Sequence, residues 1–384
     1  MNETALKVKN TFKEKFSEEP RLFYSPGRIN LIGEHIDYND GFVMPAAIDK
    51  GIYFAMAFNN SEKINCYSID FDESISLKFS EVKKMDGWKN YVLGIINEFQ
   101  KLNFQMKGFN CVFGGDIPIG GGISSSAALE GGISYGLNEL CNFQLSRKEL
   151  ALLGQRAEHN FPNVKCGIMD QYANMMGKKN TVILLDCKNV THEYLPLNIE
   201  GYQIVLINTK VHHSLASSAY NQRRKECEKG LKILQQESDI QSFRDIENPT
   251  DLFGFEKIMG EIVYKRCSFV VEEIYRTKKA ANLLKENDII GFGKLMFETH
   301  EGLKNKYEVS CEELDFLVDA AKENKDVIGS RLMGGGFGGC TINIVKEESI
   351  SSFLSEILPA YKKQFDIDAE SYNMKVVDGT GEIK

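Results

Sequence analysis

The sequence predicts an α+β fold in two domains, with mixed sheets and helices. With 384 residues the chain is longer than a single hydrophobic core usually supports. Short apolar runs of strand length are interspersed with longer stretches of helical periodicity, and no internal repeat is present. The polar stretch 188–202 contains Pro196 and Gly201 and is typical of a domain boundary. We therefore expect an N-terminal domain over residues 1–195 and a C-terminal domain over residues 196–384.

The elements of the first half follow from the spacing of apolar residues. Residues 4–16 carry Leu6, Val8, Phe12 and Phe16 among lysines, which predicts an amphipathic helix. Further helices are expected at residues 88–99, 125–141 and 147–160. Runs of β-branched, aromatic and other apolar residues predict strands at 52–58, 64–69, 109–113 and 182–185.

The second half contains another set of strands and helices. Strands are expected at residues 204–207 and 341–345, and helices at 219–236, 268–286 and 311–323. The polar segment 238–256 lacks a clear period, so we expect irregular structure there. A glycine cluster at 334–339 separates the last predicted helix from the last predicted strand.

Charge and cysteine usage argue against several classes of protein. The formal net charge of −8 disfavours nucleic acid or an anionic membrane as a partner, because both attract basic surfaces. No apolar run approaches the roughly 20 residues that span a bilayer, and the polar N-terminus lacks a secretory core. The nine cysteines are scattered singly, which argues against a disulfide framework or structural zinc. We expect a cytoplasmic monomer that acts on small molecules.

Residues 118–128 hold three consecutive glycines at 120–122 and three serines at 124–126. Glycine lets a backbone approach a ligand closely, and the free N–H groups at a helix start attract phosphate. No Walker motif occurs in the chain, and Ser125 replaces the third glycine of a Rossmann fingerprint. A capped helix behind a flexible turn remains the alternative. The combination of glycines and serines favours a phosphate site.

The second glycine cluster, residues 334–339, does satisfy the pattern G-x-G-x-x-G. A β-branched strand follows it instead of a helix, so the dinucleotide interpretation fails. Glycines before a strand indicate close packing against another backbone or a ligand.

Residues 26–41 are dense in polar side chains that lie between apolar ones. Glu34, His35 and Asp37 offer donors and acceptors within four residues, which suits the hydroxyl groups of a sugar. Arg28 carries a permanent cation with a planar fork suited to carboxylate or phosphate. The alternatives are a structural His35 and an Arg28 paired with a surface carboxylate. No second histidine lies at a ligand spacing, which argues against a metal site.

Two further acids lie in the stretch 157–171. Glu158 is near the end of a predicted helix, and Asp170 follows Gly167 between Met169 and an amide side chain. An acid in such an apolar setting is more typical of a catalytic base than of a solvated charge.

Taken together, these segments resemble the galactokinase family of the GHMP kinase superfamily. Residues 27–38 resemble the galactokinase signature, residues 118–127 the phosphate-binding motif and residues 334–340 the third motif. Further similarity runs through residues 166–171, 214–220, 307–311 and 329–331. The resemblance implies a GHMP kinase fold with the active site in a cleft between two domains. It also implies ATP and Mg²⁺ as cofactors and transfer of the γ-phosphoryl group of ATP to the C1 hydroxyl of D-galactose.

The resemblance assigns roles to individual residues. Asp170 is the expected catalytic base, and Arg28 is the expected stabiliser of charge on the transferred phosphoryl group. The expected galactose ligands are Glu34, His35, Ile36, Asp37, Gly167 and Tyr220. The expected ATP contacts are Gly120, Gly121, Gly122, Ile123, Ser124, Ser125, Ser126 and Ser68, with Trp88 near the adenine. The expected magnesium ligands are Ser126 and Glu158.

Two other functions would share these motifs. A sister kinase could act on N-acetylgalactosamine, arabinose or a non-sugar alcohol, but residues 39–42 resemble kinases of the unsubstituted sugar. His212 and Ala219 depart from the usual family pattern and bear on the same choice. A non-catalytic galactose sensor would have lost residues of the serine-rich loop. That loop, Asp170 and Arg28 are intact here, which favours an enzyme.

Overall fold

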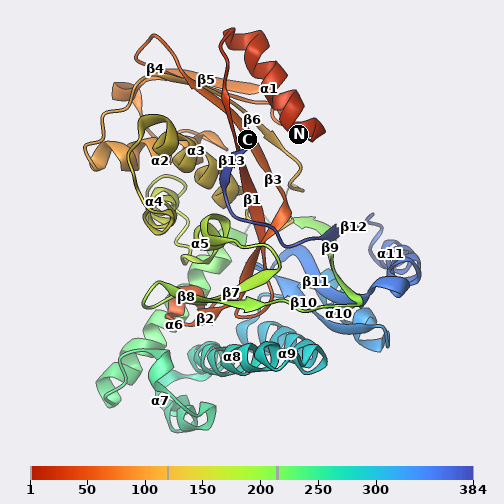
Figure 1. The fold of residues 1–384 in the computed structure, drawn as a ribbon. Helices are drawn as coiled ribbons and strands as arrows, with labels where there is room; N and C mark the ends of the chain where they lie inside the picture. The colour runs from red at the N-terminus through yellow and green to blue at the C-terminus, as the bar shows by residue number, and fades with distance from the viewer. Residues whose placement is uncertain (1, 119–120, 213–215, 384) are drawn as a thin grey trace.

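Strand β1 (Arg21–Asn30) runs through the middle of the molecule and belongs to its largest sheet (Figure 1). The computed structural model describes residues 2–118, 121–212 and 216–383. In spatial order, the six strands of this sheet are β13 (Gly381–Ile383), β1, β3 (Pro45–Phe58), β6 (Phe109–Gly115), β4 (Lys63–Ser68) and β5 (Glu73–Lys78). Only β4 and β6 pair in parallel; the other neighbours are antiparallel.

Helices cover both faces of this sheet. The elements on one face are α2 (Lys89–Lys101), α3 (Ser125–Cys141), α4 (Arg147–Asn160) and α5 (Met169–Met176); α1 (Glu3–Phe16) lies on the other. The alternation of a strand decides which side chain meets which helix. Phe54 of β3 packs beneath α3, where a Cβ on Gly132 would lie 2.0 Å from the Phe54 ring. The next residue, Ala55, faces Phe12 of α1.

A second, four-stranded sheet forms the centre of the other half. Its strands, in spatial order, are β10 (Val327–Met333), β11 (Gly338–Lys346), β9 (Tyr202–His212) and β12 (Glu370–Met374). Val205 and Ile207 of β9 pack against α10 (Glu312–Glu323) and α11 (Ile350–Phe365). Ile204 and Leu206 face the opposite way, toward α8 (Glu261–Lys285) and α9 (Ile289–Gly302). The strict alternation explains why both faces of this sheet are buried.

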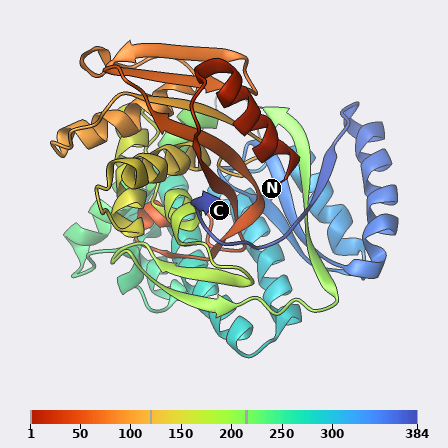
Figure 2. The same ribbon diagram turned by 45° about the horizontal axis from the view of Figure 1, so that its top comes forward.

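The chain also contains a small third sheet and further helical elements. They are the sheet of β2 (Phe42–Val43), β7 (Thr181–Asp186) and β8 (Thr191–Pro196), the helices α6 (Ala216–Glu237) and α7 (Glu256–Met259), and a π-helical turn at Leu303–Tyr307. In Figure 2 the first sheet lies above the sheet of β2, β7 and β8, and α11 lies at the right-hand edge of the molecule. Within the described residues, no helix is long and apolar enough to cross a membrane. All nine cysteines are free thiols.

Most predicted elements are present. Helices 125–141 and 147–160 match α3 and α4 at both ends. Helix α3 ends at Asn142 in the left-handed conformation, and α4 begins with a capping box at Ser146 and Glu149. The segment 238–256 contains short 3₁₀ turns at Phe243–Asp245 and Pro249–Phe255. The sequence did not predict β1, β2, β5, α5, β8, α7, α9, β10, α11, β12 or β13.

The C-terminal segment returns to the first sheet. After β12 the chain crosses the molecule, and β13 pairs with β1 at Leu22, Phe23 and Tyr24. Part of the polar stretch 188–202 forms β8, which pairs with β7 along its length. The division into domains 1–195 and 196–384 stays a prediction, and β13 belongs by pairing to the sheet of the first.

Candidate active site

The core of the site is an ion pair between β1 and α5. Arg28 Nε donates to Asp170 Oδ1 over 2.7 Å, and Nη2 donates to Oδ2 over 2.9 Å, a bidentate pair across 142 positions of sequence. The third arm of the fork, Nη1, donates to the carbonyl of Gly122 over 2.6 Å. Burial would lower the pKa of Arg28, but the carboxylates of Asp170 and Glu34 outweigh it and the pKa lies above its ordinary value. Arg28 therefore joins β1, α5 and the glycine-serine loop.

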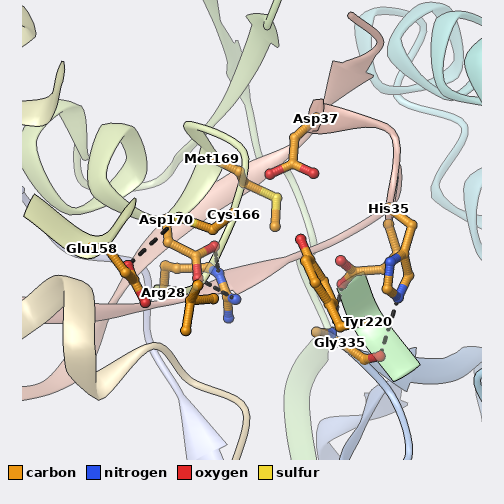
Figure 3. Close-up of a pocket in the computed structure, with 12 residues that line it drawn as sticks. Arg28, His35, Asp37, Glu158, Cys166, Met169, Asp170, Tyr220 and Gly335 are labelled. Carbon is orange, nitrogen blue, oxygen red and sulfur yellow. Dashed lines mark hydrogen bonds and ion pairs between the residues drawn. The ribbon is translucent and has the colours of Figure 1, made fainter. Parts of the chain in front are cut away.

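Asp170 lies in the first turn of α5 and accepts a third hydrogen bond. Ser124 Oγ donates to Asp170 Oδ2 over 2.5 Å. A carboxylate has about four acceptor positions, so three donors leave one position for a substrate hydroxyl. The side chain keeps 25 % of its surface exposed, and that surface faces the cavity shown in Figure 3.

The glycine-serine loop touches β1 directly. A Cβ on Gly27 would lie 2.8 Å from the carbonyl oxygen of Ile123, so only glycine permits this approach. The amide of Arg28 donates to the same carbonyl over 3.1 Å. Ser124 precedes α3 with φ of 60° and makes no side-chain cap bond, because its hydroxyl is bonded to Asp170. Gly120, one of the predicted ATP contacts, lies outside the described residues.

The third motif packs against the first signature. Glu34 is 1 % exposed, and its Oε1 accepts the amide of Gly334 over 2.8 Å. The same oxygen accepts Nη1 and Nη2 of Arg331, each over 3.2 Å. His35 Nε2 lies 3.1 Å from the carbonyl of Gly335. The glycines at 334–339 thus meet another backbone segment, as their place before a strand indicates.

Asp37 faces the same cavity without a direct cationic partner among the described residues. Burial raises its pKa to about 7, and the nearby charges of Asp170 and Glu34 add to the rise. A Cβ on Gly167 would lie 2.0 Å from Asp37 Oδ2. Gly167 is therefore the residue that leaves room for this carboxylate.

These groups enclose a cavity of about 140 Å³. Of the predicted site residues, Arg28, Glu34, His35, Asp37, Glu158, Asp170 and Tyr220 line it. Gly167 touches it through Asp37, whereas Ile36 is fully buried and packs against Gly41 in the core. Five further residues line the cavity that the sequence had not indicated as site residues: Val164, Cys166, Met169, Gly334 and Gly335. Cys166 and Met169 flank predicted residues, which is the signal that could have indicated them.

A second cavity of about 470 Å³ lies at the N-terminus of α3. Ser125 and Ser126 line it together with Trp88, Tyr91 and Phe113. Its volume lies in the range of sites for larger organic ligands, and aromatic walls are typical of them. Ser68 does not line it: this side chain is fully buried, and its hydroxyl has no partner among the described residues.

Side-chain oxygens suited as ligands of a divalent cation lie between the two cavities. The Ser126 hydroxyl lies near the carboxylate of Glu158 and acts to lower its pKa, and Gln171 Nε2 donates to Glu158 Oε2 over 2.6 Å. Burial and the charge of Asp170 raise the pKa of Glu158 to about 7. Glu130 lies on the other side of Gln171, and its Oε1 has no hydrogen-bond partner in the described structure. Buried acids short of positive charge fit a bound Mg²⁺, whose preferred ligands are oxygens.

Comparison with known proteins agrees with this geometry. Models of the GHMP kinase N-terminal and C-terminal domains match residues 90–178 and 280–363, and a galactokinase galactose-binding signature matches residues 10–58. A mevalonate kinase from Methanococcus jannaschii shares the fold at a TM-score of 0.65 and 22% identity, over 94% of this chain and 99% of that one. The fold and the site thus define a GHMP kinase.

More similar relatives narrow the class. A galactokinase of Clostridium acetobutylicum is 42% identical over 98% of this chain and 97% of its own, and that of Bacillus subtilis is 41% identical over 98% of both. The structure of Lactococcus lactis galactokinase complexed with galactose matches at a TM-score of 0.95 and 35% identity, over 98% of this chain and 99% of that one. The chain belongs to the galactokinase family. It is an ATP-dependent sugar kinase of galactose metabolism.

Proposed function

We propose that galactose occupies the 140 Å³ cavity and that the γ-phosphoryl group of ATP passes directly to its C1 hydroxyl. Four acidic side chains line this cavity, and we assign Glu34, Asp37 and Asp170, together with Tyr220, to the sugar. A sugar donates and accepts at every hydroxyl, so acidic acceptors and a phenol suit it. The volume lies below the range typical of drug-sized ligands, which favours a monosaccharide.

ATP fits the larger cavity with its phosphates at the start of α3. The amides of the first turn and the positive end of the helix favour a phosphate there. Trp88, Tyr91 and Phe113 offer aromatic surface for the base. We place Gly121, Gly122, Ser125 and Ser126 at the phosphates, while the bond of Ser124 to Asp170 gives that serine a second role.

Ser126 and Glu158 would hold Mg²⁺ beside these phosphates. The ion would offset phosphate charge and help to place the γ-phosphoryl group. The chain's own contribution is positioning: Arg28 and Ser124 hold Asp170 in one orientation, with its remaining acceptor position toward the cavity. Asp170 then accepts the proton of the C1 hydroxyl as the phosphoryl group is transferred. We expect the enzyme to act as a monomer in the cytoplasm.

The bidentate pair of Arg28 and Asp170 at the cavity is the observation that carries this proposal. An ADP-release assay with galactose, N-acetylgalactosamine and arabinose tests the substrate. We expect ADP release with galactose that stops when divalent cations are chelated. Faster turnover of either other sugar would contradict the choice of galactose.

Replacement of the base tests the mechanism. Asp170→Asn keeps the shape of the side chain but weakens it as a proton acceptor, so kcat should fall by about 10²- to 10⁴-fold. Galactose should still bind, as measured by calorimetry. The matched control is Asp186→Asn, since Asp186 pairs with Arg244 over 2.5 Å outside both cavities. Near-normal turnover in Asp170→Asn would remove Asp170 from the role of base.

A further inference from the structure

His35 lines the galactose cavity, yet both nitrogens of its ring are bonded inside the protein. Nε2 lies 3.1 Å from the carbonyl oxygen of Gly335, and Nδ1 lies 2.6 Å from the hydroxyl of Tyr38. A carbonyl can only accept, so Nε2 carries the ring proton and donates it to Gly335. Nδ1 is then the acceptor, and the Tyr38 hydroxyl donates to it.

The same reasoning extends through two more residues. Having given its hydrogen to His35, the Tyr38 oxygen accepts from the Tyr307 hydroxyl, 3.0 Å away. The Tyr307 oxygen in turn accepts from the thiol of Cys227 over 3.2 Å. We name Cys227, Tyr307, Tyr38 and His35 the hydrogen-bonded chain. The carbonyl of Gly335 at its end sets the direction of every bond in it.

Burial keeps each member of this chain in the protonation state that the bonds need. Burial lowers the pKa of His35 to about 3, against the raising effect of the Gly335 carbonyl, and the charge of Arg223 lowers it further. The imidazole is therefore neutral at physiological pH. Burial raises the pKa of Cys227 to about 12 and that of both tyrosines well above the ordinary value. The thiol and the phenols keep their hydrogens.

We infer that His35 is a positioning residue that fixes the backbone of Gly335 as a wall of the sugar cavity, rather than a direct ligand of galactose through its ring nitrogens. Glu34 holds the preceding amide, that of Gly334, over 2.8 Å, so two adjacent side chains hold two adjacent backbone groups. The ring of Tyr220 is tilted by 41° to that of His35 with 5.2 Å between the ring centroids, and it lies against Gly335. A shift of Gly335 would therefore move a proposed sugar contact. The inference rests on the proposed placement of galactose.

Kinetics of Tyr38→Phe test the positioning role. This change removes the hydrogen that Nδ1 accepts and leaves the cavity lining intact. We expect the KM for galactose to rise about three- to tenfold, the size of effect typical of one lost buried hydrogen bond. The KM for ATP and kcat should change less than about twofold. Unchanged KM values for both substrates would overturn the role.

A matched control separates this effect from general loss of stability. Tyr361 is fully buried in the second half and donates to the carbonyl of Thr209 over 2.9 Å. Tyr361→Phe loses a buried hydrogen bond of the same kind and should leave the KM for galactose unchanged. An equal rise in KM in both variants would also overturn the role.

Nitrogen NMR of the enzyme, recorded first without and then with galactose, tests the hydrogen bonds of the His35 ring. With ¹⁵N-labelled histidine, and His35→Gln to assign the signals, Nε2 should be protonated and Nδ1 unprotonated from pH 5 to 8. The opposite tautomer, or titration near pH 6.5, would overturn the inference even if galactose still shifts these signals. The expected tautomer with no response to galactose would instead overturn the proposed placement of the sugar.

Discussion

Four acidic side chains line one cavity, and three of them differ in the groups that bind their oxygens. Asp170 is held by Arg28 and Ser124. Glu34 is held by Arg331 and the amide of Gly334. Asp37 has no such donor among the described side chains, and burial raises its pKa to about 7. The charge of Asp37 therefore changes near neutral pH, and its ionised form is the stronger acceptor for a sugar hydroxyl.

The pH dependence of galactose binding follows from that difference. Below about pH 7 Asp37 carries a proton that must leave before the carboxylate can accept, which costs binding free energy. We expect galactose affinity to rise by up to tenfold per pH unit toward pH 7 and then to level off. Binding near pH 7 should release a proton, measurable by calorimetry in buffers of different ionisation enthalpy.

Glu158 has a pKa of about 7 as well, so a control is needed. Asp37→Asn removes one of the two groups and should abolish the proton release on galactose binding. If the release persisted in that variant, Asp37 would not be its source.

Single residues could be indicated by sequence only where their chemistry was unusual for their setting. Asp170, an acid among apolar neighbours, stood out in this way. The hydroxyl of Ser124 did not, because a serine before a helix predicts a cap, whereas this one bonds Asp170 from 46 positions away. Ile36 lies in the core although the family signature contains it, since adjacent side chains of a turn point in different directions.

At the scale of elements, the contact of β1 with the glycine-serine loop should be sensitive to a single methyl group. A Cβ at residue 27 would lie 2.8 Å from the carbonyl oxygen of Ile123 and 2.9 Å from Cγ2 of the Ile123 side chain. We expect Gly27→Ala to lower the free energy of unfolding by about 1–3 kcal/mol, as overpacking usually does. It should also raise the KM for ATP, because the loop must move away from β1.

Gly254 provides the control for this change. No heavy atom lies within 4 Å of the Cβ that alanine would add there. Gly254→Ala should leave both thermal unfolding and the KM for ATP unchanged. Equal behaviour of the two variants would show that the contact with Ile123 has no energetic role.

Two of the elements that the sequence did not predict, β1 and α5, carry Arg28 and Asp170. Strand β1 contains Pro26 and Gly27, which usually interrupt strands, and its register shifts between Pro26 and Arg28. Helix α5 is only eight residues long and buries the polar side chains of Asn174 and Gln171, so the segment is too short for a helix to be predicted from its apolar residues. The longer helices α3 and α4 were predicted at their observed bounds.

At the scale of the whole molecule, the C-terminal segment forms hydrogen bonds with two elements of the site, β1 and α5. Thr380 is fully buried, and its hydroxyl lies 3.0 Å from Ser25 Oγ of β1 and 2.7 Å from Asn174 Oδ1 of α5. Its amide donates to the carbonyl of Asn174 over 2.8 Å. The segment thus connects the strand that carries Arg28 with the helix that carries Asp170.

Loss of these bonds should weaken the entire fold. Thr380→Val keeps the shape of the side chain but leaves buried polar groups without a partner, which costs about 1–3 kcal/mol in unfolding free energy. Chemical denaturation measures this change. Thr181→Val is the control, because the Thr181 hydroxyl bonds the carbonyl of Lys178 at an exposed turn. A Thr380 variant as stable as this control would contradict the connecting role.

The amino-acid sequence by itself determined the fold class, the long amphipathic helices and the chemistry available at the site. Local patterns suffice for these, since helical periodicity and motif composition are properties of short segments. Only the tertiary structure decided which acceptor of Asp170 stays open and which ring nitrogen of His35 carries the proton. It alone also showed that residues 379–383 pack behind the site. Each of these depends on contacts between segments from 46 to more than 300 positions apart, and burial sets their energy only after the chain has folded.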